Sequence, residues 1–336
     1  MDIRRPNGIP AVEYRRDDAA PMDANEEDVL LESRKPEMSA ILAMIERAAG
    51  GDSTILITGE SGTGKDVLAQ QIHRWSPRRH GPFVVISCTT LAEHMLEDEL
   101  FGHVRGSFTG AINDKPGRLE AVNGGTVLFD EIAELPTSLQ IKFLRFVQDR
   151  CFERIGSNRT LEVDARVVVA SNRNLEAEVA AGRFREDLYY RLNVITFTLP
   201  PLRERTQDIL PFAEWMLKRM SSASGRPEHR LSPEAGEALM SYRWPGNVRE
   251  LHNALKRAAD LARTDTITVD DLPDSVRNRA SAMRAAPAAS GTRLKDFERE
   301  HILRALAESS TLGQAAATLG INVTTLWRKR RHYGIG

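Results

Sequence analysis

The stretch TILITGESGTGKD, residues 54–66, decides the fold of this chain. A run of apolar, mostly β-branched residues leads directly into a glycine-rich segment, and a helical pattern begins at Asp66. The segment has the G-x-x-x-x-G-K form of a phosphate-binding loop, in which backbone N–H groups and a helix N-terminus converge on phosphate oxygens and Lys65 reaches the terminal phosphates. The residues predicted to hold the nucleotide are Gly59, Glu60, Ser61, Gly62, Thr63, Gly64, Lys65 and Asp66.

The residue after Lys65 departs from the usual pattern. That position normally carries Ser or Thr, whose hydroxyl binds Mg2+, and this chain has Asp66 there. A chance glycine-rich turn is the alternative interpretation of the loop alone. A second motif, GGTVLFDE at residues 124–131, argues against chance, because it places Asp130 and Glu131 at the carboxyl end of a strand, where parallel sheets bind their ligands.

The two carboxylates of the second motif are predicted to have different tasks. Asp130 is expected to hold Mg2+, directly or through water, and Glu131 to polarise the attacking water. Asp130 therefore has to stay ionised beside a cation, whereas Glu131 has to be free to accept a proton. An Asp-Glu pair that only caps the next helix is the structural alternative.

Composition limits the class of protein. The chain has 336 residues, of which 41% are hydrophobic, and a formal net charge of -1, so a nucleic-acid partner has to be met by a local basic patch. The two cysteines, Cys88 and Cys151, form neither a disulfide framework nor a metal cluster. Because the sequence has no apolar run of membrane-spanning length and no signal core, we expect a cytoplasmic protein with no membrane partner.

Alternating β-branched runs and amphipathic segments predict an α/β core whose parallel sheet is covered on both faces. The expected strands are STILIT, FVVISC, GTVLFD, ARVVVASN and NVITFTLP. The expected parts of the chain are a mobile, disordered tail (1–28), an α/β subdomain (29–200), a small helical lid subdomain (201–273), a linker (274–292) and an all-α helix-turn-helix domain (293–336).

The C-terminal segment TLGQAAATLGINVTTLWRKRRHYG has the pattern of a helix-turn-helix. Small and apolar residues mark one helical face, Gly320 breaks the first helix, and Thr324 or Asn322 is expected to cap the second. Eight basic residues against four acidic ones give the module a local charge of +4. A solvated basic helix end is the alternative to a DNA-binding surface.

Together the motifs closely resemble the AAA+ ATPase activators of sigma-54 RNA polymerase, the NtrC-like bacterial enhancer-binding proteins. The resemblance runs from about Leu30 to the C-terminus and rests on six motifs in the family's order: GESGTGKD, ELFGHVRGSFTGA, GGTVLFDEI, FREDLYYRLNV, LPPLRER and WPGNVREL. It implies an AAA+ P-loop core, ATP and Mg2+ as cofactors, and a homo-oligomer, from dimer to hexameric ring, with ATP between protomers. Since no receiver or other sensory domain fits in the short tail, we expect activity that is constitutive or set by a separate regulatory protein.

The resemblance assigns roles to residues that a nucleotide site formed by a single chain would not use. Arg185 and Arg191 match the family's arginine fingers, which reach a neighbour's nucleotide, although taken locally they suit surface ion pairs equally well. Ser171 and Asn172 match the sensor that contacts the γ-phosphate. Arg249 matches the second sensor, on the lid, which lets nucleotide state alter the angle between the two subdomains.

The segment GSFTGA matches the loop with which the family contacts the sigma factor. The predicted contact residues are Gly106, Ser107, Phe108, Thr109, Gly110 and Ala111. Phe108 and Thr109 are expected to form the tip, and the two glycines to let the loop rise and fold back as the nucleotide changes. A phenylalanine tucked into its own domain is the alternative.

Two positions depart from the family pattern. Ser87 replaces the usual Asn, which is thought to hold the catalytic glutamate in check, and a serine hydroxyl is shorter and offers one donor instead of two. We expect Ser87 to hold Glu131 weakly or through water, which makes hydrolysis less dependent on the sigma factor. Ser107 replaces the usual Ala, and we expect its hydroxyl to be solvated on an exposed loop.

The C-terminal module resembles the Fis-like DNA-binding domain that ends many of these activators. The predicted contacts are Thr324, Thr325, Arg328 and Lys329 to the DNA groove, and Arg330, Arg331 and His332 to phosphates. The resemblance implies an ATP-driven activator that binds upstream enhancer DNA and remodels the sigma-54 holoenzyme so that promoter DNA opens. Two alternatives stay open: a DNA-bound regulator that uses nucleotide only to control its oligomeric state, and a small-molecule P-loop kinase.

Overall fold

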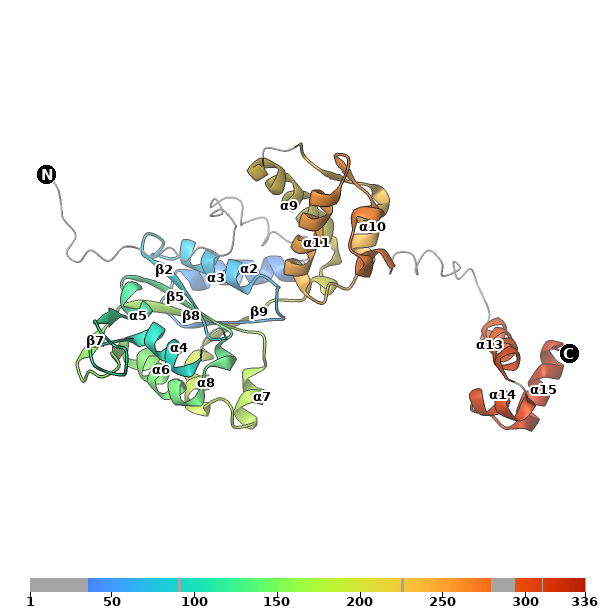
Figure 1. Cartoon of the computed structure of the whole chain (residues 1–336), viewed down its shortest axis with the longest axis horizontal. Coiled ribbons are helices and arrows are strands. Elements are labelled where there is room, and N and C mark those ends of the chain that lie inside the picture. Colours follow the sequence, from blue (N-terminus) through green and yellow to red (C-terminus); the bar gives the residue numbers. More distant parts are fainter. Residues whose placement is uncertain (1–35, 90–91, 225–226, 279–293, 310, 336) are drawn as a thin grey trace. The chain divides into compact units, whose positions relative to one another are not determined.

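The structure is a computed structural model that describes residues 36–89, 92–224, 227–278, 294–309 and 311–335 (Figure 1). The chain divides into two compact units, Met1–Ala280 and Ser281–Gly336. The tail predicted over residues 1–28 and most of the linker predicted over residues 274–292 lie outside the described residues.

A five-stranded parallel sheet with the strand order β2-β5-β8-β1-β9 forms the centre of the first unit. Its strands are β1 (Ile55–Thr58), β2 (Phe83–Ser87), β5 (Gly125–Asp130), β8 (Ala165–Ser171) and β9 (Ile195–Thr198). Each of the five predicted strands is present in this sheet. The predicted parallel α/β core is therefore confirmed.

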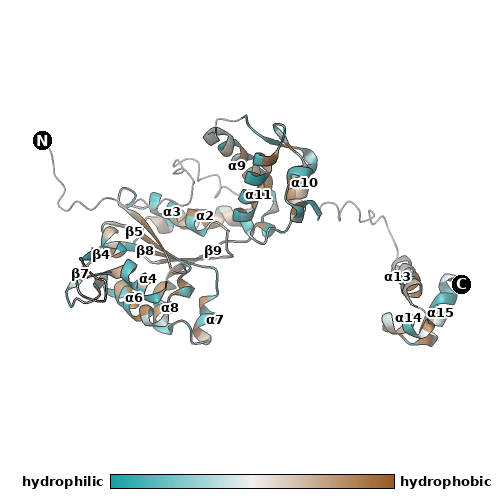
Figure 2. Cartoon of the chain, viewed as in Figure 1, coloured by the Kyte–Doolittle hydropathy of each residue, from teal (hydrophilic) through white to brown (hydrophobic). Residues whose placement is uncertain are grey.

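Helices cover both faces of the sheet (Figure 1). On one face lie α2 (Pro36–Ala49) and α3 (Lys65–Arg74), and the other is covered by helices that include α6 (Thr137–Asp149). In β5, Val127 and Phe129 are buried with the α6 side, whereas Leu128 is buried with α2 and α3. A central strand buried on both faces is mainly apolar, which explains the hydrophobic runs at residues 127–129 of β5 and 167–170 of β8 (Figure 2).

Short elements surround the sheet. The further helices are α4 (Glu93–Phe101), α5 (Arg118–Ala121), α7 (Leu175–Ala180), α8 (Glu186–Leu192) and the 3-10 helix η1 (Ile132–Glu134). Two antiparallel hairpins pair β3 (Gly102–His103) with β4 (Lys115–Pro116) and β6 (Cys151–Glu153) with β7 (Thr160–Glu162). Strands of two or three residues carry too little periodicity to be predicted from sequence.

The lid is mainly helical, as predicted. It contains η2 (Leu202–Glu204), η3 (Thr206–Asp208), α9 (Ile209–Ser224), α10 (Pro233–Ser241), α11 (Asn247–Leu261), η4 (Val269–Asp271) and the strand pair β10 (Arg230–Leu231) and β11 (Thr266–Ile267). Phe212, Trp244 and Leu255 are among its fully buried side chains. Residues 274–278 are helical, and Val276 is buried in the same cluster, so the packed lid extends beyond residue 273.

The second unit consists of α13 (Leu294–Glu308), α14 (Leu312–Thr318) and α15 (Val323–Tyr333). Ile302, Ala315, Ala316 and Leu326 form its buried core. Of the two predicted capping residues, Asn322 caps α15, because its side chain accepts a hydrogen bond of 2.7 Å from the N–H of Thr325. In the described part of the chain, no helix combines the length and the hydropathy that a membrane span needs.

Candidate functional site

The glycine-rich loop joins the carboxyl end of β1 to the N-terminus of α3. Gly62 and Gly64 have φ angles of 77° and 96°, which side-chain-bearing residues rarely adopt. A Cβ at Gly62 would lie 2.4 Å from the carbonyl oxygen of Gly246 on the lid. The backbone of the loop therefore favours glycine at both positions, and the lid packs against the loop at Gly62.

Lys65 lies within this loop and is only 6% exposed. Its ammonium group donates to the carbonyl oxygens of Gly59 and Glu60, at 3.0 and 3.2 Å. The same nitrogen is 3.8 Å from Oε1 of Glu131. The sheet thus places the lysine of the first motif beside the glutamate of the second.

Glu131 begins η1 immediately after β5. Its φ angle of 54° is unusual for a residue with a side chain and marks a strained backbone, a feature common at functional sites. Oε2 of Glu131 accepts a hydrogen bond of 3.1 Å from the main-chain N–H of Asn172, at the end of β8. Burial raises the pKa of Glu131, while the charge of Lys65 and the Asn172 N–H act in the opposite direction.

Asp130 ends β5 and is half-buried. Burial raises its pKa, the charge of Lys65 lowers it, and the charge of Asp66 raises it further. Among the described residues, no three His, Cys, Asp or Glu side chains gather into a metal cage. A magnesium ion is usually held by one or two carboxylates together with substrate phosphates, so Asp130 beside a phosphate loop fits Mg2+.

Ser87 ends β2 and is paired with Asp130 in the register of the sheet. Its hydroxyl lies 3.0 Å from the hydroxyl of Thr89. The expected hold of Ser87 on Glu131, weak or through water, stays a prediction.

The lid contacts the phosphate loop directly. Arg249, the predicted second sensor, donates from Nη1 to Oγ of Ser61 at 3.0 Å. The side chain of Glu60 is bound by Arg203, which donates to its two carboxylate oxygens at 2.6 and 2.7 Å. Sequence reasoning missed Arg203, although it stands in the motif LPPLRER.

Of the two predicted arginine fingers, one directly precedes α8 and the other lies in its last turn. Arg185 precedes the helix and donates to both carboxylate oxygens of Asp187, at 2.7 and 3.0 Å. This ion pair raises the pKa of Arg185. Arg191 lies in the last turn of the helix and is exposed. The local contacts agree with the surface ion pair that sequence alone allowed, and a role towards a neighbour stays a prediction.

The loop between β3 and β4 carries the GSFTGA segment. Gly106 and Gly110 have φ angles of 84° and 104°, with open space where a Cβ would lie. Phe108 is 47% exposed, and its ring meets the ring of His103 edge-on at 4.9 Å. Ala111, in contrast, is only 7% exposed. The tip therefore presents Phe108 and turns Ala111 inward.

Ser107 differs from the expectation of a solvated hydroxyl. Its Oγ is buried, and the structure gives that atom no hydrogen-bond partner among the described residues. The side chain lies against Gly156, where an added Cβ would come within 2.5 Å of the Ser107 Cβ. The expectation was wrong because the loop folds back onto the β6–β7 hairpin region instead of standing free.

In the helix-turn-helix unit, the predicted DNA-contact residues fall into two groups that differ in solvent exposure. Thr324, Arg328, Arg331 and His332 are exposed on α15. Lys329, in contrast, bonds to Glu298 of α13, and Arg330 is half-buried. Sequence reasoning missed Trp327, which is 56% exposed and has the Arg331 guanidinium 5.6 Å from its ring centre.

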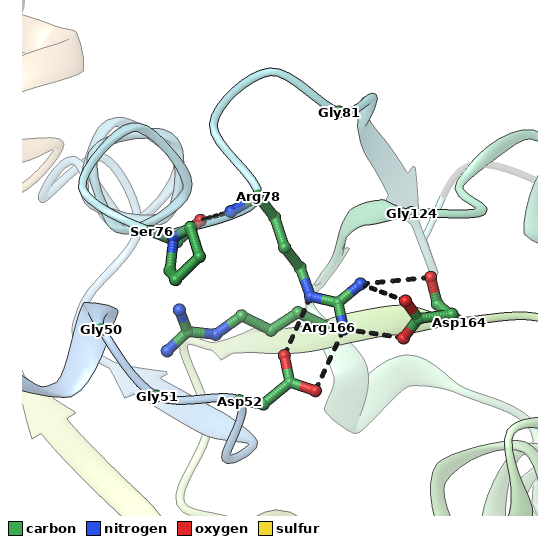
Figure 3. A pocket seen from close by; sticks show the side chains of 10 residues that line it. Gly50, Gly51, Asp52, Ser76, Arg78, Gly81, Gly124, Asp164 and Arg166 are labelled. Carbon is green, nitrogen blue, oxygen red and sulfur yellow. Dashed lines mark hydrogen bonds and ion pairs between the residues drawn. The ribbon is translucent and has the colours of Figure 1, made fainter.

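A cleft of about 460 Å3 lies at the opposite edge of the sheet from the phosphate loop (Figure 3). Arg78 bonds there to both Asp52 and Asp164, residues that precede β1 and β8. These charged groups are already paired with one another, and Lys65, Asp130 and Glu131 of the two nucleotide motifs do not line the cleft. The arrangement therefore ties the amino ends of the strands together.

Three family models match the chain in succession. They describe a sigma-54 interaction domain over residues 31–198, an AAA+ ATPase lid domain over residues 203–289 and a bacterial regulatory protein of the Fis family over residues 293–333. The alginate biosynthesis transcriptional regulatory protein AlgB of Pseudomonas aeruginosa is 48% identical over 305 residues, which cover 91% of this chain and 68% of AlgB. The response regulator protein PilR of the same organism is 42% identical over 92% of this chain and 70% of its own length.

Among solved structures, NtrX of Brucella abortus in complex with ADP has a TM-score of 0.68 and 31% identity, over 91% of this chain and 69% of NtrX. The ATP complex of the same protein has a TM-score of 0.67 and 32% identity. These matches confirm the family and the fold that the motifs predicted. The chain belongs to the sigma-54 activator family, with its AAA+ interaction domain, its lid domain and its C-terminal Fis-type helix-turn-helix.

Proposed function

We propose that this protein is an ATP-hydrolysing activator that binds enhancer DNA and remodels the sigma-54 RNA polymerase holoenzyme so that the promoter opens. The observation that carries the proposal is Phe108, an aromatic side chain left 47% exposed on a loop with a positive-φ glycine on either side. Large aromatic side chains dominate the energetics of protein interfaces, so an exposed one on a hinged loop suits contact with a partner.

The proposed hydrolytic site consists of Lys65, Asp130 and Glu131. Lys65 binds the terminal phosphates, and the half-buried Glu131 carboxylate accepts a proton from the attacking water. Asp130 holds Mg2+, which supplies positive charge to the transferring phosphoryl group. Asn172 holds Glu131 through its main-chain N–H, so its side-chain amide is available to the γ-phosphate.

The proposal includes a ring of protomers that share their sites. Arg185 and Arg191 sit on the surface of α8, and the contacts of Arg185 are to Asp187 and Gln140 of its own chain. From this position we assign both arginines to the nucleotide of a neighbouring protomer, where they neutralise the charge that develops on phosphate. Exposed Tyr190 and Val194 lie close by in sequence, and apolar side chains at a surface suit burial between copies.

The exposed face of α15 is the proposed DNA-binding surface. Thr324, Arg328 and Arg331 project from a helix whose N-terminus is capped by Asn322, the arrangement of a recognition helix in a major groove. Because Lys329 is paired with Glu298, we assign this lysine to the packing of the unit and not to the predicted groove contacts.

Open-complex formation by purified sigma-54 holoenzyme tests the proposal. We expect promoter opening only with this protein and hydrolysable ATP, and loss of opening in Phe108→Ala with ATP hydrolysis retained. Ile141→Ala, which removes a side chain 55% exposed on α6, is the matched control and should behave as wild type. Opening with a non-hydrolysable analogue would favour the regulator that uses nucleotide only to control its oligomeric state.

A further inference from the structure

Asn247 is a fully buried polar residue where the lid meets the phosphate loop. Its Oδ1 accepts a hydrogen bond of 2.8 Å from the N–H of Leu202 in η2, the first segment of the lid, which connects it to the α/β subdomain. Its Nδ2 donates to the carbonyl oxygen of Ser61 at 3.0 Å and to Oε2 of Glu60 at 3.3 Å. One amide therefore joins the phosphate loop, the connecting segment and the first residue of α11.

The backbone of Asn247 is held in a strained state. Its φ angle is 52°, in the left-handed region that costs energy for any residue with a side chain and least for glycine, asparagine and aspartate. Such strain persists only where surrounding contacts enforce it. Here the three side-chain hydrogen bonds use the amide oxygen and both amide hydrogens, so the side chain cannot also reach a bound nucleotide.

Glu60 and Arg203 form the second part of the same junction. Nη1 and Nη2 of Arg203 donate to the two carboxylate oxygens of Glu60, at 2.7 and 2.6 Å, in a fork geometry that fixes direction as well as charge. Arg203 lowers the pKa of Glu60, so the carboxylate is ionised at neutral pH. Glu60 is thus bound by Arg203 of η2 and by Asn247 of α11.

Lid residues bind each residue of the loop from Glu60 to Thr63. The carbonyl oxygen of Gly62 accepts hydrogen bonds from the N–H groups of Val248 and Arg249, at 2.9 and 3.3 Å. The carbonyl oxygen of Thr63 accepts one of 3.2 Å from Arg205, which is 2% exposed. The carbonyl oxygens of Ser61, Gly62 and Thr63 are thus bound by the lid and the segment that connects it, whereas that of Glu60 accepts from Lys65, so these contacts fix the conformation of the loop backbone.

We propose that Glu60, Arg203 and Asn247 are positioning residues that hold the phosphate loop ready for ATP and transmit its movement to the lid. This inference rests on the proposed ATPase function. Preorganisation lowers the ordering cost of binding, so these residues act on nucleotide affinity and leave the chemical step to Lys65, Asp130 and Glu131. Because α11 is bonded to the loop at Gly62, a shift of the loop on nucleotide binding moves the start of α11 with it.

Two variants of the full chain separate this role from mere packing. Asn247→Gly tolerates the left-handed backbone and removes the side chain with its amide, and Glu60→Gln keeps the shape and removes the charge that Arg203 binds. Asp52→Asn is the matched control, because it neutralises a carboxylate that binds Arg78 in the same two-bond manner at the far edge of the sheet. The measurements are KM and kcat for ATP hydrolysis and amide hydrogen exchange at Val248 and Arg249.

We expect Asn247→Gly and Glu60→Gln to raise the KM for ATP about tenfold with kcat within about twofold, as for loss of one or two hydrogen bonds in binding. Exchange at the amides of Val248 and Arg249 should become about tenfold faster, because these N–H groups bond to Gly62. Asp52→Asn should leave KM, kcat and exchange at wild-type values.

The proposal is overturned if both variants keep the wild-type KM and exchange, or if they lower kcat while KM is unchanged. If Asn247→Gly fails to fold, Glu60→Gln and Arg203→Lys test the proposal, because both alter an ion pair at the surface. Arg203→Lys keeps the positive charge but loses the two-bond geometry of the guanidinium, and should give a KM between those of wild type and Glu60→Gln. If the wild-type chain hydrolyses no ATP, the proposed function fails. Amide hydrogen exchange at Val248, measured with and without ADP, still tests whether the phosphate loop is coupled to α11.

Discussion

The main-chain N–H of Asn172 donates a 3.1 Å hydrogen bond to Oε2 of Glu131, and this bond joins the end of β8 to the end of β5. The two strands are neighbours in the sheet, so the sheet itself sets the distance between the proposed sensor and the proposed base. Lys65 approaches the other carboxylate oxygen, Oε1, at 3.8 Å. The Glu131 carboxylate is therefore oriented before any nucleotide contact is made.

The pH dependence of ATP hydrolysis should show the environment of Glu131. Burial raises its pKa above the ordinary glutamate value of 4.5. A general base works only when ionised, so kcat/KM for ATP should fall as the pH drops through this raised pKa of the free protein, at a higher pH than an ordinary glutamate allows. The measurement is a profile of kcat/KM in acid. Glu131→Gln should lower kcat by about 10²–10⁴-fold with nucleotide binding retained, and a wild-type acid limb at or below pH 4.5 would contradict the assignment.

Neutralising Asp130 should stabilise the protein while it removes hydrolysis. Burial raises the pKa of Asp130 above 3.8, so the folded state binds the proton more tightly than the unfolded state, and the ionised carboxylate destabilises the fold at neutral pH. We expect Asp130→Asn to raise the free energy of unfolding at pH 7 by on the order of 1 kcal/mol. The gain should shrink as the pH is lowered through the raised pKa and vanish below the unfolded value.

Thermal unfolding at neutral and acid pH measures the effect of Asp130→Asn. Asp164→Asn is the control of opposite sign, because Arg78 lowers the pKa of Asp164 and makes its ionised form favourable. A lower Tm for Asp130→Asn than for wild type at pH 7 would show that the charge of Asp130 is stabilising.

Removal of the Ser107 hydroxyl should stabilise the folded-back loop. The Oγ of Ser107 is buried without a partner among the described residues, and an unsatisfied buried polar atom costs about 1–3 kcal/mol. In Ser107→Ala we expect slower hydrogen exchange at the loop amides of Gly106 and Ala111, which donate to the carbonyl oxygens of Ala111 and Phe108 respectively. Thr109→Ala, at the exposed tip, should leave exchange unchanged. Equal exchange in Ser107→Ala and wild type would show that water satisfies the hydroxyl.

Substitution of two adjacent basic residues of α15 should affect DNA binding differently. Arg328 is exposed, so Arg328→Ala should weaken binding to enhancer DNA and reduce the slope of log affinity against log salt by about 1. Lys329 bonds to Glu298, so Lys329→Ala should instead lower the thermal stability of the unit. Affinity measured over a salt series tests both. Arg299→Ala, an exposed arginine of α13, is the control for charge alone, and a loss equal to that of Arg328→Ala would exclude a recognition surface on α15.

The local chemistry of the chain was predictable from sequence. The five strands of the sheet, the glycine-rich loop, Lys65 and the Asp130–Glu131 pair are encoded by consecutive residues, because strand periodicity and backbone conformation depend on near neighbours. The helix-turn-helix was predictable for the same reason, since Gly320 and Asn322 mark its turn and cap.

Only the tertiary structure decided which side chains meet. Glu60 and Arg203 are 143 positions apart, and Glu60 and Asn247 are 187 apart, so no local pattern points to their junction. The buried hydroxyl of Ser107 depends on the loop folding back towards Gly156. The sequence by itself determined the chemical groups that this protein carries; the packing of distant segments decided which of them are buried, paired or exposed, because burial and pairing depend on neighbours in space.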